Sequence, residues 1–194
     1  MFQPPNARGF CFCNFTSMLD YQENYLKSVL FEFRRYKTLG DKTFAQLEEK
    51  DMHWTFSKSD NSIAVIVKHM TGNMLSRWTN FLTEDGEKTW RDRETEFIAP
   101  LESKWEMIQT WENGWQCLFD ALDTLNSENF ETTQLKIRNQ PHTIFEAVNR
   151  QLAHYANHVG QIVYIGKMIK GAEWVSLSIP KGGSQEYNQS MFKN

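Results

Sequence analysis

The chain has 194 residues, of which 40 % are hydrophobic and 23 % are charged, a composition typical of a globular domain with a sizeable core. Its 21 basic and 24 acidic side chains leave no excess positive charge to drive binding to nucleic acid or to an anionic membrane surface. Lysines interrupt the longest apolar stretches, SIAVIVKHM and QIVYIGKMI, well before the roughly 18 apolar residues of a membrane span. We therefore expect no nucleic-acid partner and no membrane partner.

The cysteines and the N-terminal segment bear on location and domain organisation. Three cysteines, two of them within the first 13 residues, provide no disulfide framework and are typical of a reducing compartment, so we expect a cytoplasmic protein. Residues 1–17 lack both a helical period and the pattern of a secretory signal. They predict a loose N-terminal extension ahead of a single domain over residues 18–194, with Met18 as a candidate native start.

Four segments carry apolar side chains at three- and four-residue steps, the spacing of a helix with one buried face. These predicted helices span about residues 20–49, 63–82, 102–125 and 143–170. Gly40 lies inside the first, but the apolar stripe resumes in phase beyond it, which favours one long helix. Thr143 and Glu146 stand at the spacing of a capping box at the start of the fourth, and Gly171 ends that helix.

The segments between these helices are rich in turn-forming residues. Residues 83–100 are too polar for regular core structure and predict a long functional loop between the second and third helices. Residues 132–143 alternate in polarity and are a candidate for a short extended piece, whereas residues 172–194 predict an irregular C-terminal tail. Four long helices without a strong strand signal predict an all-α fold, a four-helix bundle.

Two histidines in the fourth predicted helix are candidate metal ligands. His154 and His158 are four residues apart in QLAHYANHVGQ, so both rings can reach one ion from one helical face. With 5 histidines in the chain, such a pair occurs by chance in about one sequence of this kind in eight, so a third ligand is needed. His69 is that candidate, because it lies on an apolar part of the second helix, where an unpaired imidazole is costly to bury. The alternative is three core histidines satisfied by hydrogen bonds alone.

Neighbouring polar side chains are candidates for a supporting role. Gln161 lies near the face of the histidine pair, and Asn73 lies one turn beyond His69, so either could orient a ligand or a bound water; a solvated side chain is the alternative for both. Tyr155 stands where a zinc-protease helix carries glutamate, which argues against peptide hydrolysis by that mechanism. No residue is assigned as a catalytic acid, base or nucleophile.

Two arginines in the predicted loop are candidates for contact with a substrate. Arg91 and Arg93, in TWRDRETEF, could fix an anionic cosubstrate, because a guanidinium pairs with a carboxylate through two hydrogen bonds. The alternative is that both lie on the surface and balance the acidic residues of the same stretch.

Taken together, the pattern resembles the DinB-like superfamily, the DinB/YfiT-like metalloenzymes, and within it a branch of uncharacterised bacterial proteins once described as a domain of unknown function. The matching stretches are YLKSVLFEFRRYK, NSIAVIVKHMTGNMLSRWTNFLTEDGEKTWRDRETEF, AVNRQLAHYANHVGQIVYIGK and WVSLSIPKGGS. The resemblance implies a four-helix bundle with a divalent metal ion held by His69, His154 and His158. It also implies a homodimer and, as in characterised relatives, transfer of a low-molecular-weight thiol such as bacillithiol or mycothiol, or isomerisation of the glutathione type.

Three functional hypotheses follow. In the first, the histidines hold Zn²⁺ or Ni²⁺ with one open position, where a thiol cosubstrate loses its proton and attacks a small-molecule electrophile. Metal affinity should then fall as the pH drops below about 6.5, the ordinary pKa of imidazole, because only the neutral ring is a ligand. In this hypothesis we expect His69 to lie partly exposed in a cleft. The second hypothesis is a stress protein that binds a metal or small ligand without turnover, and the third is a structural dimer with metal-free histidines.

Overall fold

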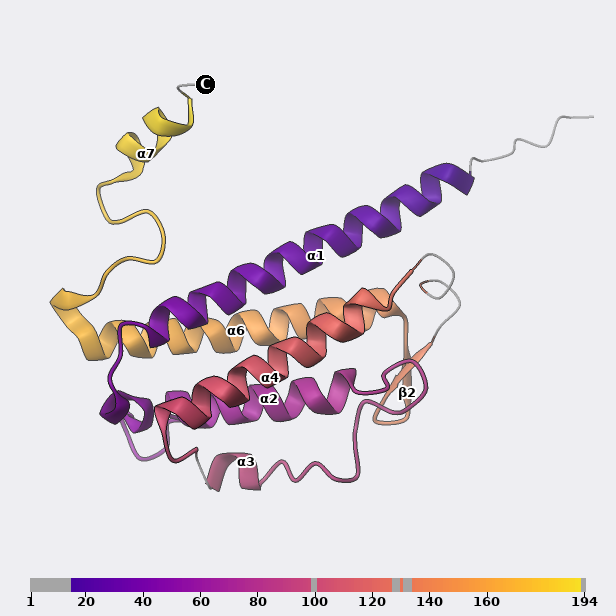
Figure 1. The fold of residues 1–194 in the computed structure, drawn as a ribbon, viewed down its shortest axis with the longest axis horizontal. Helices are drawn as coiled ribbons and strands as arrows, with labels where there is room; N and C mark the ends of the chain where they lie inside the picture. Colours follow the sequence, from indigo (N-terminus) through magenta and orange to yellow (C-terminus); the bar gives the residue numbers. More distant parts are fainter. Residues whose placement is uncertain (1–14, 99–100, 127–129, 131–133, 193–194) are drawn as a thin grey trace, which may run out of the picture.

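The computed structural model describes residues 15–98, 101–126, 130 and 134–192, and their fold is mostly helical with a small two-stranded sheet (Figure 1). The four longest helices are α1 (Phe15–Phe44), α2 (Ile63–Trp78), α4 (Lys104–Asp123) and α6 (Ile144–Lys170). Helices α1 and α2 each pack against both α4 and α6, and the buried apolar side chains of all four form one core. Within the described residues, no helix is both long enough and apolar enough to cross a membrane.

Short elements connect and extend these helices. They are η1 (Glu49–His53), α3 (Thr95–Ile98), β1 (Leu135–Ile137), β2 (Gln140–His142), η2 (Gly171–Glu173) and α7 (Ser184–Met191). The antiparallel strands β1 and β2 form the extended piece expected here and are joined by Arg138 and Asn139. Both turn residues have positive φ, 54° and 59°, as in a type I′ hairpin. Asp85 fixes this turn, because its carboxylate accepts hydrogen bonds from the two backbone N–H groups at 2.9 and 2.6 Å.

Side-chain caps start three of the long helices. The hydroxyl of Ser62 accepts a hydrogen bond from a backbone N–H of α2, and Ser103 does the same for α4. At α6, Thr143 accepts from the Glu146 N–H at 3.2 Å while the Glu146 carboxylate accepts from the Thr143 N–H at 2.8 Å, which confirms the predicted capping box. Gly171, with φ of 53°, ends the helix as predicted.

Helix α1 is a single helix through Gly40, as predicted. The glycine has a packing role, because a Cβ at this position would overlap the ring of Trp111, whose indole N–H donates to Asp41 at 2.8 Å. The helix begins at Phe15, inside the segment predicted to be an extension, while residues 1–14 lie outside the described part of the chain.

Several predicted boundaries are wrong. Helix α1 ends at Phe44 rather than near residue 49, and η1 follows as a separate element. Helix α2 ends at Trp78 rather than residue 82, because Asn80 has a φ of 49°, which an α-helix does not accommodate. The predicted loop contains α3, and the tail predicted to be irregular contains η2 and α7. No residue of α7 is buried, and Figure 1 shows this helix apart from the four long ones.

Candidate metal centre

The three histidines predicted as ligands lie together where α2 faces α6. His69 comes from α2, and His154 and His158 lie one turn apart on α6. Each offers one ring nitrogen, and these three atoms all lie within 4.8 Å of one another. The Nε2 atoms of His154 and His158 are 3.0 Å apart, and the His69 ring centroid lies 5.6 and 5.0 Å from theirs. The packing of two helices therefore builds a cluster from residues that are far apart in the sequence.

A buried carboxylate holds the ring of His69. Glu96, on α3, places Oε2 2.9 Å from His69 Nδ1, and each of these residues is only 5 % exposed. Arg91 binds the same carboxylate through two hydrogen bonds, from Nε to Oε1 at 2.8 Å and from Nη2 to Oε2 at 3.0 Å. Because Nδ1 is engaged, Nε2 of His69 is left for another ligand. Metal-binding histidines typically have this carboxylate support.

Glu96 remains ionised in this position, although it is buried. Burial acts to raise the pKa of its carboxyl group, but hydrogen bonds from His69 and Arg91 outweigh burial, and the pKa lies below its ordinary value. Gly72 makes the close approach possible, because a Cβ there would overlap the Glu96 carboxylate. The missing side chain on α2, one turn from His69, is what lets α3 place an acid against this helix.

The two polar residues predicted to support the histidines have different roles. Gln161 Oε1 lies 3.2 Å from Nδ1 of His158, so it is in position to orient that ring. Asn73 Oδ1 instead accepts a hydrogen bond from the fully buried Tyr155 hydroxyl at 3.0 Å. The same hydroxyl accepts from the Trp78 indole at 3.2 Å, so Asn73 belongs to a buried network between α2 and α6.

A cationic cavity of about 220 Å³ adjoins the cluster. It is lined by His69, Asn73, Arg77, Arg91, Arg93, Arg138, Arg150, Gln151 and His154. Sequence reasoning had singled out Arg91 and Arg93 but missed the other three arginines. Helical spacing contained a signal for two of them, because Arg77 lies eight residues after His69 and Arg150 lies four residues before His154.

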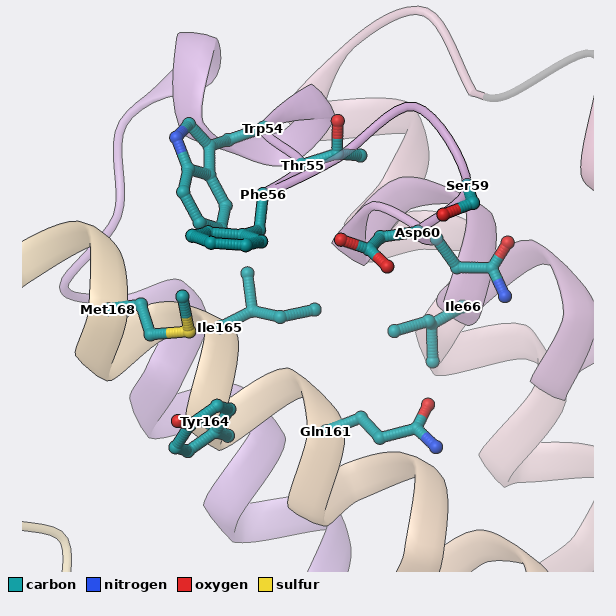
Figure 2. A pocket seen from close by; sticks show the side chains of 11 residues that line it. Trp54, Thr55, Phe56, Ser59, Asp60, Ile66, Gln161, Tyr164, Ile165 and Met168 are labelled. Atoms are coloured by element: carbon teal, nitrogen blue, oxygen red, sulfur yellow. The ribbon is translucent and has the colours of Figure 1, made fainter.

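A second, mainly apolar cavity of about 650 Å³ lies between the segment that follows η1 and α6 (Figure 2). Trp54 and Phe56, which follow η1, lie across it from Tyr164 and Gln161 on α6. Its volume is within the range of small-molecule sites. Since Gln161 also contacts His158, the histidine cluster borders the cationic cavity directly and the apolar cavity through this glutamine.

The imidazoles of α6 favour their neutral form. Burial, together with the nearby imidazoles of His158 and His69, lowers the pKa of His154 to about 4. The pKa of His158 is also lowered, again by burial first and then by His69. Both rings therefore favour the neutral form, which binds a metal, at neutral pH, and His154 keeps that form well below it. For these two candidate ligands, we expect the loss of metal affinity on acidification to begin below the ordinary pKa of imidazole.

We expect the metal-free protein to lose stability between pH 7 and pH 4.5. In this interval His154 takes up a proton near pH 6.5 when unfolded but only near pH 4 when folded, so the unfolded state binds more protons and the free energy of unfolding falls with the pH. Because His154 is only partly buried, solvent screening reduces the full effect of this shift, and we expect a loss of about 1–2 kcal/mol, which denaturant unfolding of chelator-treated protein measures. The free energy of unfolding of His154→Ala should depend less steeply on pH than that of the wild type. Equal slopes in the variant and the wild type would contradict a lowered pKa of His154 in the folded protein.

The fold and the site define a class: helical proteins with a carboxylate-supported histidine cluster between two facing helices. Residues 20–183 match the family described as "Protein of unknown function (DUF1572)", and the chain belongs to this family. No curated protein and no solved structure matched the chain.

Proposed function

We propose that the protein is a metal-dependent transferase of low-molecular-weight thiols, built as a homodimer of four-helix bundles of the DinB-like type. The observation that carries this proposal is the convergence of three imidazole nitrogens within 4.8 Å, one of them backed by the Arg91-bound carboxylate of Glu96. The resemblance to DinB-like metalloenzymes supports the reaction type.

The donor set fits a divalent ion such as Zn²⁺ or Ni²⁺. Two nitrogens bound at about 2.1 Å to one tetrahedral ion are roughly 3.4 Å apart. The His154 and His158 nitrogens are 3.0 Å apart, and all three lie within 4.8 Å, so small ring rotations bring them to this geometry. Three neutral imidazoles are ligands that suit these ions and leave coordination positions free.

Each part of the site then has a chemical task. When bound, a divalent ion supplies positive charge that lowers the pKa of a thiol at the open position. Glu96 accepts a hydrogen bond from His69 Nδ1–H and Gln161 accepts one from His158 Nδ1–H, which would keep the Nε2 atoms of both rings available to a bound ion. The apolar cavity receives the electrophile. The thiol proton passes to solvent, sulfur bonds to the electrophilic carbon, and the leaving group departs with its electron pair.

The alternative function is binding of a metal or small ligand without turnover. It is favoured by the engagement of both Glu96 oxygens, because this leaves the carboxylate nearest to the histidines without a free position to act as a base. Asp60, the carboxylate that lines the apolar cavity, likewise accepts a hydrogen bond from the Ser57 backbone.

A thiol should alter the absorption spectrum of the Co²⁺-substituted protein, because sulfur entering the coordination shell changes geometry and charge transfer. The metal-loaded protein should also accelerate conjugation of a thiol, bacillithiol included, to an apolar electrophile. His158→Ala should abolish both effects. This residue is a better target than His69, which is buried at 5 % exposure against our expectation of a partly exposed side chain and whose loss would disturb Glu96.

The matched control is His53→Ala, which removes an exposed histidine outside the cluster and should leave spectrum and turnover unchanged. A spectral change without turnover across a panel of thiols and electrophiles would favour the binding function. If no combination of thiol and electrophile gave either a spectral change or turnover, thiol transfer would be refuted.

A further inference from the structure

The cavity beside the histidine cluster is lined by an unusual number of cations. Five of its lining side chains are arginines, and among the described residues that line it there is no carboxylate. The five are Arg77, Arg91, Arg93, Arg138 and Arg150. They come from α2, the loop before α3, the β-hairpin turn and α6, so the tertiary fold gathers like charges that repel one another.

The carboxylates nearby do not balance these charges. Glu96 is taken up by Arg91, while Glu87 is shared by Arg138 at 3.0 Å and Arg77 at 3.3 Å. Within the described part of the chain, Arg93 and Arg150 form no ion pair. Asp85, at the turn that carries Arg138, also attracts Arg77, so three carboxylates stand against five guanidinium groups and the cavity keeps an excess of positive charge.

Two buried side chains of the cavity have polar atoms without a protein partner. Gln151 is 3 % exposed and its Oε1 accepts no hydrogen bond, and Arg77 is 7 % exposed and its Nε donates none among the described residues. Buried polar atoms are nearly always hydrogen-bonded, so each indicates a missing partner. Both side chains line the cavity, and an oxyanion inside it is positioned to accept a hydrogen bond from Arg77 Nε, whereas Gln151 Oε1 needs a donor such as a hydroxyl group or a water molecule.

The exposed side of the cavity carries three arginines, one of which lies in a turn that hydrogen bonds hold in place. Arg138 has a left-handed backbone conformation, which is uncommon for residues other than glycine, and the carboxylate of Asp85 holds the two N–H groups of its turn. Arg93 and Arg150, both exposed, complete this side. Buried groups thus form the inner part of the cavity and three exposed guanidinium groups its outer part.

We infer that this cavity is an anion-binding subsite for a small molecule whose charged group carries at least two negative charges, as carboxylates or as phosphate. Guanidinium groups bind both kinds of oxyanion through paired hydrogen bonds. The inference extends the proposed function, and its relevance to a thiol substrate rests on that function. His69 and His154 line the same cavity, so a substrate anchored there reaches the histidine cluster. The volume of about 220 Å³ admits a compact charged group rather than a whole drug-sized ligand.

Calorimetric titration with inorganic phosphate and succinate tests the subsite, with singly charged acetate for comparison. Wild-type, metal-loaded protein should bind phosphate or succinate saturably and at least about tenfold more tightly than acetate. The double variant with Arg93→Ala and Arg150→Ala should weaken this binding at least about tenfold, since each exchange removes charge-assisted hydrogen bonds. Arg35→Ala, at an exposed arginine on α1, is the matched control and should leave the affinity for phosphate and succinate unchanged. Preference for phosphate or for succinate identifies the kind of oxyanion.

The same titration of His158→Ala separates the subsite from the metal, because His158 does not line the cavity. Phosphate or succinate binding that persists in this variant while metal is lost assigns the anion to the arginines, even if thiol transfer fails. Two results would overturn the inference: wild-type protein that binds these anions no more tightly than the double arginine variant, or binding that is lost in His158→Ala and kept in the double arginine variant.

Discussion

His154→Ala should lower the affinity for Zn²⁺ on the order of 100-fold or more and leave the purified protein with little metal, against about one ion per wild-type chain. Each ligand of a zinc site contributes several kcal/mol to binding, and Nε2 of His154 lies 3.0 Å from that of His158. Elemental analysis of purified protein and competition with a chromophoric chelator measure stoichiometry and affinity.

The matched control is His53→Ala, at an exposed histidine on η1. This variant should keep the wild-type metal content and affinity. If His154→Ala also kept both, the three histidines would not be the metal ligands. They would then be core residues held by hydrogen bonds such as that between His69 and Glu96.

Glu96→Gln should have two effects, one on the metal and one on the fold. Loss of the charge weakens the acceptor that holds His69, and removal of such a partner typically costs 10- to 100-fold in metal affinity. The exchange also leaves Arg91, whose side chain is 3 % exposed, without its counter-charge. We therefore expect the metal-free variant to lose about 3 kcal/mol in free energy of unfolding, as for other broken buried ion pairs.

Glu94→Gln is the control, since it removes an exposed carboxylate from the same segment. Both variants are compared by Zn²⁺ affinity at a temperature where each is fully folded, and by urea unfolding after chelator treatment. A variant Glu96→Gln that loses stability but binds Zn²⁺ like wild type would show that Glu96 serves the fold alone. If Glu96→Gln and Glu94→Gln were equally stable, this would contradict the role of Glu96 as the buried partner of Arg91.

Features that depend on neighbouring residues could be predicted from the sequence. The capping box of Thr143 and Glu146 and the end of α6 at Gly171 each depend on a few consecutive residues, and both are confirmed. The pairing of His154 with His158 is equally local, because helical spacing alone places both rings on one face. His69 could be proposed because a polar ring in an apolar stretch needs a partner.

Features that depend on contacts distant in the sequence could not be predicted. Glu96 lies 27 residues beyond His69 in a polar loop, where an acid is ordinarily solvated, and only the packing of α3 against α2 buries it. Arg138 reaches the cavity through a hairpin turn held by Asp85, more than 50 residues earlier. For the same reason the sequence did not predict that Arg91, a candidate for contact with a substrate, holds a buried carboxylate.

The absent side chain at Gly72 limits how the sequences of this family can diverge. Any other residue there would occupy the space of the Glu96 carboxylate and push α3 away from α2, so His69 would lose its support. The two positions, 24 apart in the chain, are therefore expected to change together across the family. A relative with a larger residue at the position of Gly72 should also lack the acid at the position of Glu96. Another group would then be needed to orient the histidine that corresponds to His69.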